Sequence, residues 1–144
     1  TAVGAALADD DDSAARAGAA TLVQAITDLT KAGRPFDPLI ADAAVTLAAE
    51  TSGLAAQRAA FETVNLALLP LVTLHPEALG AAVDQVYCPM AFDGRGAPWL
   101  QRAGEVANPY FGAGMLGCGA KEASFGADQP RSATPAATTR DGGE

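Results

Sequence analysis

The chain has little sulfur, almost no histidine and few basic residues. Its 144 residues include two cysteines, two methionines, one histidine and nine lysines and arginines against 17 acidic residues, for a net charge of −8. Two cysteines are too few for a disulfide scaffold, but they allow one bridge or one soft-metal site. An acidic chain without a basic stripe argues against binding to nucleic acid or to anionic membrane surfaces.

Long hydrophobic runs are also missing. The longest, at 64–74, contains an asparagine, a proline and a threonine and is typical of a buried helix rather than a membrane span. No signal peptide is recognisable. Because the chain begins at Thr1 and not at methionine, we expect a mature or trimmed product whose targeting segment has been removed.

Alanine, the best helix former, is abundant and lies in segments with helical spacing of apolar residues. We predict helices over about 14–30, 38–50 and 54–74, and a fourth that begins at Pro76. Residues 2–8 are expected to form a helical lead-in. Amphipathic helices with short connections are typical of an up-and-down bundle.

We therefore predict an all-α domain, a bundle of about four helices capped by a glycine-rich loop. The helical domain would span 1–123 with the loop at 87–119, and 124–144 would be a disordered tail or linker. Asp37 is expected to cap the second helix, with Pro38 as its first residue. The expected core comprises Leu22, Ile26, Leu47, Phe61, Val64 and Leu68.

The segment 87–119 loses helical periodicity and carries seven glycines and three prolines. We expect an ordered loop, with a short helix near 99–106 and a short strand pair near the two cysteines. Its aromatic residues would pin the loop to the body of the fold, and they could also shield a metal from water. They are Tyr87, Phe92, Trp99, Tyr110 and Phe111.

Every sulfur atom of the chain falls in that segment, as Cys88 and Met90 in a C-x-M pair and Met115 and Cys118 in an M-x-x-C pair. Residue chemistry leaves three interpretations open. The cysteines could form a structural disulfide, which would stabilise the fold by roughly 3.5 kcal/mol in the chain-entropy account. Thiolates and thioethers together could form a soft-metal site that selects Cu(I). The thiols could also be inert and buried. We predict that the two cysteines lie close together in space, whichever chemistry holds.

Other candidate sites are weaker. His75 precedes a proline at an expected helix start and is interpreted as a capping residue. The acidic run 9–12 is interpreted as a solvated helix start. The stretch GRGAPW lacks the lysine of a phosphate-binding loop. With no plausible nucleophile and base pair, we predict no catalytic activity.

The stretches YCPMAFDGRGAPWLQ and NPYFGAGMLGCG resemble the signature of a family of uncharacterised bacterial periplasmic domains. That signature reads CPMA, then WL, then NPY-aromatic-G, then ML-x-CG. The upstream AAQRAAFETVNLALLPLV is similar to the family's third helix. The resemblance covers about 2–123, and members occur alone or fused to adaptor subunits of Cus-type heavy-metal efflux pumps. Many relatives carry histidine at the position of Tyr87.

The resemblance implies a periplasmic or secreted domain for copper or heavy-metal homeostasis or efflux. Cys88, Met90, Met115 and Cys118 match the sulfur positions of the motif and would bind the metal, with Cu(I) as the expected ion. An efflux adaptor or another periplasmic metal-handling protein would be the partner. The alternative is a structural or partner-docking helical module in which Cys88 and Cys118 form a disulfide and no metal binds.

Overall fold

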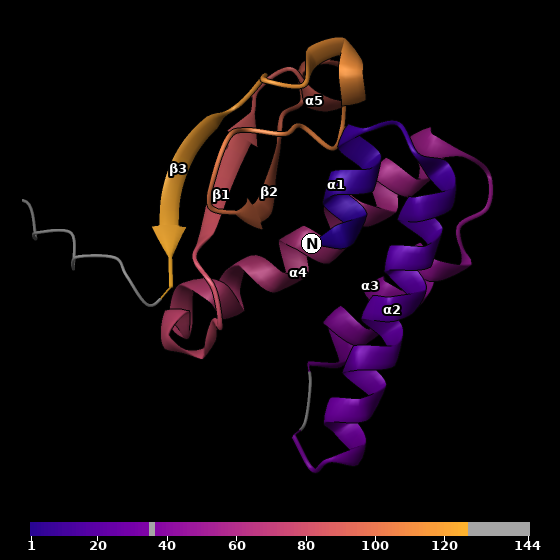
Figure 1. The fold of residues 1–144 in the computed structure, drawn as a ribbon, viewed down its shortest axis with the longest axis vertical. Coiled ribbons are helices and arrows are strands. Elements are labelled where there is room, and N and C mark those ends of the chain that lie inside the picture. The colour runs from indigo at the N-terminus through magenta and orange to yellow at the C-terminus, as the bar shows by residue number, and fades with distance from the viewer. Residues whose placement is uncertain (35–36, 127–144) are drawn as a thin grey trace, which may run out of the picture.

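The computed structural model describes residues 1–34 and 37–126, and within them helices lie beside a three-stranded antiparallel sheet (Figure 1). The predicted all-α class is therefore wrong, and the fold is mixed α/β. The helices are α1 (Ala2–Ala8), α2 (Asp12–Lys31), α3 (Pro38–Ala49), α4 (Leu54–Leu74) and the short α5 (Ala91–Gly94). The strands are β1 (Val83–Cys88), β2 (Ala97–Arg102) and β3 (Ala120–Phe125), and 3-10 turns occupy Pro76–Ala78 and Gly112–Met115.

The helical part agrees closely with the sequence prediction. The α4 helix has the predicted bounds, and α3 begins at Pro38 with the Asp37 carboxylate accepting the Leu39 N–H at 2.8 Å. Residues 2–8 form α1, a separate helix. A turn containing Asp10, whose φ is 57°, separates it from α2. Carboxylates at the starts of α2 and α3 satisfy backbone N–H groups that have no partner within the helix.

The prediction of a fourth helix from Pro76 onward is wrong. Only residues Pro76–Ala78 are helical, as a single 3-10 turn, and β1 occupies 83–88. Val83 and Val86 are three residues apart, which is compatible with one face of a helix. In the strand, however, burial alternates with a period of two, and Asp84, Val86 and Cys88 point inward. A buried aspartate among these positions hid the alternation that normally indicates a strand.

The sheet has the order β2-β1-β3, and both pairs are antiparallel. The short helix predicted near 99–106 is wrong, because residues 97–102 form β2. The strand pair expected near the cysteines is present as β1 and β3, with Tyr87 opposite Ala120. Cys88, the last residue of β1, lies opposite Ala97 at the start of β2.

The core is shared between the helices and the sheet. Ile26, Leu47, Phe61 and Val64 are buried as predicted, while Leu22 and Leu68 are only partly buried. Trp99 and Val86 of the sheet belong to the same apolar cluster as Phe61. Each such side chain contributes about 1.5–3 kcal/mol when it is fully buried.

Polar contacts join α4 to the sheet side of the molecule. The buried Asn65 accepts the Leu100 N–H of β2 at 2.9 Å. Glu62 forms two hydrogen bonds with the Arg95 guanidinium, at 2.8 and 2.6 Å. Two parallel bonds of this kind fix geometry as well as supply attraction. The residues that follow β1 are therefore positioned by α4.

The predicted domain boundary at 123 falls inside β3, which includes residues 124 and 125. The remainder of the predicted tail, from 127 onward, lies outside the described residues. None of the described helices is both long enough and apolar enough to cross a membrane.

Candidate functional site

The two cysteines lie together at one end of the sheet, which confirms that they are close in space. Their Sγ atoms are 3.0 Å apart, and both are free thiols. Cys88 ends β1, and Cys118 lies two residues before β3, the strand that pairs with β1. Cys88 is fully buried, whereas Cys118 is partly exposed. Sheet pairing thus brings together two residues that are 30 positions apart.

The contact between the thiols affects the acidity of Cys118. Hydrogen bonding with Cys88 raises the pKa of the Cys118 thiol, and burial adds to that rise. The physical reason is that the neutral thiol shares a proton with its neighbour, while the thiolate loses hydration and faces a second sulfur.

The two methionines are close to the cysteines in the sequence, and both lie on the surface. Met90 directly precedes α5 and is 53% exposed, and Met115 ends the second 3-10 turn and is 36% exposed. The Cys118 N–H donates to the Met115 carbonyl at 3.0 Å. Met90 also lines a cleft of about 580 Å³ whose aromatic walls are Phe92, Tyr110 and Phe111. The structure brings the cysteines into contact and leaves the methionines accessible.

Asn108 closes the loop that carries Cys118. Its side chain is fully buried, and its Nδ2 donates to the Cys118 carbonyl at 2.7 Å. Its Oδ1 accepts the N–H groups of Tyr110 and Phe111 at 2.8 and 3.2 Å. One amide thus shapes the turn that follows it and holds the backbone of Cys118.

Arg58 of α4 holds the same loop from the helix side. Its Nε donates to the Pro109 carbonyl at 2.9 Å, and its Nη2 donates to Leu7 O at 3.0 Å and to Asp10 Oδ1 at 2.5 Å. Asp10 Oδ2 accepts the Ala113 N–H at 3.0 Å. The hydrogen bond from the Ala113 N–H lowers the pKa of Asp10 most, and the hydrogen bond from Arg58 lowers it further.

Sequence reasoning did not assign roles to Asn108 or Arg58. The Asn-Pro dipeptide of NPYFG was a usable signal, because asparagine before proline favours turns. Gly112 of the same motif has φ +63°, and a Cβ there would overlap the Asp10 carboxylate. Much of the NPYFG motif therefore has a structural explanation within this loop.

The aromatic residues attach the segment to the body of the fold. Trp99 and Tyr110 are buried and meet edge to face at 5.7 Å, and Phe92 lies 5.0 Å from Tyr110. The Tyr110 hydroxyl donates to the Pro98 carbonyl at 2.6 Å. Burial raises the pKa of Tyr110, so the phenol keeps its proton and remains a donor. Phe92, Phe111 and Cys118 are partly buried, and each packs against the main apolar core.

The turn after Met90 has an uncommon backbone. Phe92 and Asp93 have φ of 52° and 59°, and Gly94 has φ of 82°. Successive residues in this region are unfavourable for side chains other than glycine. The Arg95 guanidinium lies 4.8 Å from the Phe92 ring and pairs with Glu62, and these contacts hold the turn against α4.

A second ionic cluster lies at the other end of β1. The Asp84 side chain is almost fully buried and binds Lys121 Nζ at 2.8 Å and the Ser124 hydroxyl at 2.7 Å. It also accepts the Gly104 N–H at 3.3 Å. Burial by itself raises the pKa of Asp84, but the bonds from Lys121, Ser124 and Gly104 outweigh it, so the net shift is downward.

His75 occupies a cap position, as predicted: it is the C-cap of α4 and the N-cap of the 3-10 turn Pro76–Ala78, although its side chain makes no cap hydrogen bond. Its Nδ1 lies 3.3 Å from Glu77 Oε1 in an exposed pair. Within 1–34 and 37–126, no cluster of three or more histidines, cysteines, aspartates and glutamates is placed to hold a metal ion. Among the residues that the structure describes, the thiol pair is therefore not part of a larger cluster of these ligand types.

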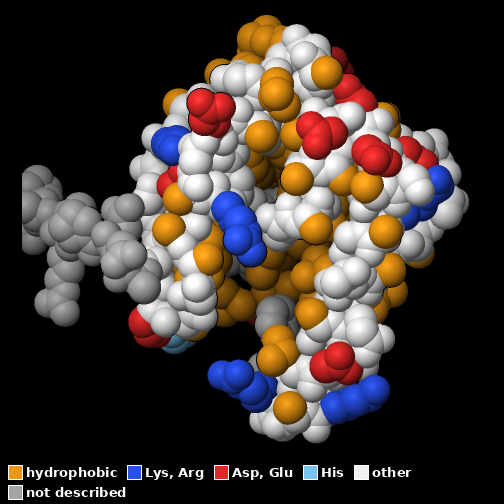
Figure 2. Space-filling view, viewed as in Figure 1, with side chains coloured by type: hydrophobic (Ala, Val, Ile, Leu, Met, Phe, Trp, Pro, Cys, Tyr) orange, Lys and Arg blue, Asp and Glu red, His pale blue; other side chains and the backbone are white. Residues whose placement is uncertain are grey.

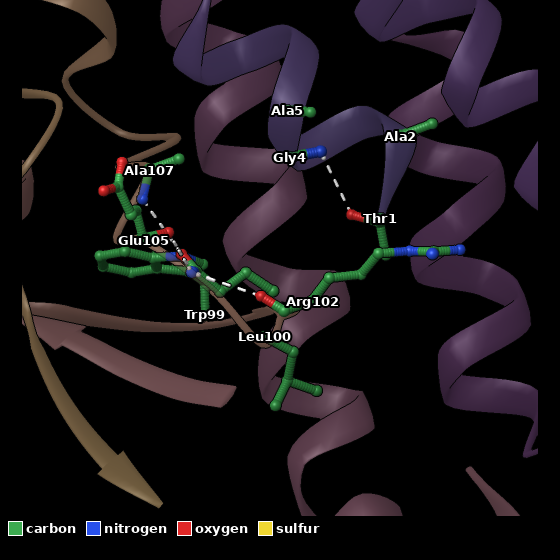
Figure 3. A pocket seen from close by; sticks show the side chains of 10 residues that line it. Thr1, Ala2, Gly4, Ala5, Trp99, Leu100, Arg102, Glu105 and Ala107 are labelled. Atoms are coloured by element: carbon green, nitrogen blue, oxygen red, sulfur yellow. Dashed lines mark hydrogen bonds between the residues drawn. The ribbon is translucent and has the colours of Figure 1, made fainter. Parts of the chain in front are cut away.

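A separate cavity of about 390 Å³ lies between α1 and the end of β2 (Figure 3). The amide of Gln101 is already engaged there, since its Oε1 accepts from Trp99 Nε1 at 3.0 Å and from Ala107 N at 3.2 Å. Arg102 and Glu105 supply the charged groups of its lining. Figure 2 shows hydrophobic side chains in the hollow between the sheet and α2. No sulfur-bearing residue lines this cavity.

No protein-family model matches the chain, and no curated protein or solved structure matches it either.

Proposed function

We propose that this chain is an extracytoplasmic domain that binds a soft metal ion, Cu(I), for copper or heavy-metal homeostasis or efflux. The single observation that carries the proposal is the 3.0 Å contact between the Cys88 and Cys118 thiols. Two sulfurs held that close can reach one ion with little movement of the backbone. The domain would be periplasmic or secreted, and its partner would be an efflux adaptor or another metal-handling protein.

The donor set suits a soft cation. Thiolates bind Cu(I) strongly, and thiolates and thioethers together select Cu(I) over harder ions. Binding releases the thiol protons, so protons compete with the metal. Because the pKa of Cys118 is raised, we expect the apparent Cu(I) affinity to fall as the pH is lowered.

The methionines would complete the coordination. Met90 and Met115 are accessible, and the unbranched methionine side chain reorients easily. Their thioethers stay neutral at every pH and add softness without charge. In this arrangement the cysteines supply affinity, and the methionines shield the ion and extend the soft ligand set toward the surface.

A structural or partner-docking module is the second candidate, in which the cysteines form a disulfide and no metal binds. The observation that favours it is the number of contacts that hold the Cys118 loop without metal, above all those of Asn108 and Arg58. Because these hydrogen bonds already stabilise the loop, its structure does not depend on a bound metal.

An anaerobic Cu(I) titration against a competing chelator, with a free-thiol count beside it, separates the two candidates. Metal binding predicts two free thiols when they are counted in denaturant before loading, strong competition for one ion and a rise in thermal stability with free metal. Replacing Cys88 or Cys118 with serine should abolish the competition. Two blocked thiols together with no uptake would instead establish the structural module.

A further inference from the structure

We propose that Cys88 and Cys118 form a thiol–disulfide exchange centre in which Cys118 reacts first and Cys88 second. The substrate class is a small molecule with an accessible disulfide. This activity goes beyond the proposed metal site, because it uses the same two sulfurs but needs no metal.

The order of reaction follows from burial. Cys88 is fully enclosed at the end of the central strand, whereas Cys118 is partly exposed in the loop before β3. An external disulfide must approach in line with the attacking sulfur, so it can reach only Cys118. Thiol reactivity depends on access as well as on thiolate fraction.

The second step follows from distance. The Cys88 and Cys118 Sγ atoms are 3.0 Å apart, and a disulfide bond is about 2.05 Å long, so closure requires a shift of roughly 1 Å. The Asn108 amide holds the Cys118 backbone in place at 2.7 Å. The second thiol is therefore already beside the sulfur that it must attack.

The chemistry balances without any group outside the two reactants. The Cys118 thiolate attacks one sulfur of the small disulfide, forms a mixed disulfide and expels one small thiolate. The Cys88 thiolate then attacks the Cys118 sulfur and expels the second small thiolate, leaving a Cys88–Cys118 disulfide. The protons lost by the two cysteines are taken up by the two leaving thiolates. The protein is oxidised by two electrons and the small disulfide is reduced by two.

Exchange would control metal loading. A disulfide has no thiolate to offer a cation, so oxidation would remove both strong ligands together. Excess small thiol would reverse the two steps and restore them. The amount of metal that the domain can bind would then depend on the redox state of the compartment.

The test uses oxidised glutathione as the probe, with a chelator present to exclude metal, and intact-protein mass as the readout. The parent should lose two hydrogens and retain no glutathione. Cys88→Ser should accumulate one glutathione on Cys118. Cys118→Ser should be modified at least roughly tenfold more slowly, since its remaining thiol is buried. In denaturant the two variants should react at similar rates.

Two results would overturn the proposal: equal rates for the folded variants, or a parent that keeps its glutathione adduct. If a variant does not fold, brief alkylation of the folded parent followed by peptide mapping gives the same answer. Cys118 should be labelled before Cys88, and equal labelling would contradict the inference. Since metal is excluded, failure here leaves the Cu(I) titration unaffected, and failure of that titration leaves the exchange result unaffected.

Discussion

The helices and the sulfur-bearing segment are stabilised by different forces. The helices α2, α3 and α4 pack through alanines and branched aliphatic residues, with side-chain caps at the starts of α2 and α3. The segment from Cys88 to Cys118 also packs aromatic residues into the core, but its loops depend in addition on side chains that bond backbone groups, chiefly those of Asn108 and Arg58. Apolar packing tolerates small adjustments, whereas such hydrogen bonds require particular atoms in particular places.

The largest effect is expected where the two regions meet, at Phe61. This side chain is almost fully buried, and its ring centroid lies 6.4 Å from that of Tyr110. Phe61→Ala should lower the free energy of unfolding by about 3–5 kcal/mol. Chemical denaturation followed by circular dichroism measures this. Leu66→Ala, on the same helix but half exposed, is the control and should cost far less.

Removal of the Asn108 side chain should damage the thiol loop next most strongly. Asn108→Ala leaves buried backbone groups without partners, at about 1–3 kcal/mol for each such group. Asn108→Asp is the sharper variant, because it keeps an oxygen for the Tyr110 N–H and loses the donor to Cys118.

The Asn108→Asp variant should retain most of the secondary structure yet close the Cys88–Cys118 disulfide more slowly. Mass spectrometry after oxidised glutathione would show this as a longer-lived mixed disulfide. An unchanged closing rate would mean that Asn108 shapes the turn without positioning Cys118.

Arg58→Lys tests whether the loop depends on the shape of the guanidinium. Lysine keeps the charge but cannot bond Pro109, Leu7 and Asp10 with the same planar fork. A loss of about 1–2 kcal/mol is expected in urea unfolding. Arg16→Lys, whose arginine pairs with Asp12 at the surface, is the matched control and should change stability little.

Acid should weaken the sheet through Asp84. Its pKa is lowered in the folded state, so it binds protons less readily there than when unfolded. The resulting stability is present above the unfolded pKa and is lost as the pH falls through the folded pKa. Unfolding measured between pH 6 and pH 2, about the range in which carboxylates titrate, should therefore be less pH-dependent for Asp84→Asn than for the parent.

The smallest effect on stability is expected from replacing both methionines with leucine. Met90 and Met115 are exposed, and the change conserves volume, so the cost should be well below about 1.5 kcal/mol. Cu(I) affinity should nevertheless fall in a chelator competition. An affinity equal to the parent's would show that the thioethers are not ligands.

The helices were predictable because capping and periodicity are local. Asp37 and Pro38 mark the start of α3 in the sequence, and the structure uses them in that way. The strands were harder to predict. Asp84 can point inward because Lys121 and Ser124 bind its carboxylate. Those residues are about forty positions away, so the sequence around Asp84 does not reveal them.

The thiol pair was predicted from its chemistry, and its closeness is confirmed. The residues that position it were not predicted. Asn108 acts on a carbonyl ten residues ahead, and Arg58 acts on one 51 residues ahead. Neither spacing follows from a helix or strand period, so only the folded chain reveals these roles.

The hydrogen bond from the Ala113 N–H to Asp10 joins residues 103 positions apart. Contacts between such distant residues form late, because the chain must first lose the entropy of a long loop before the contact is gained. The helices can nucleate from neighbouring residues. The Cys118 loop is completed only when Ala113 contacts Asp10, in the turn after α1. During refolding, helical signal should therefore appear before the thiols become protected, and for that interval Cys88 would be open to chemistry that the finished fold denies it.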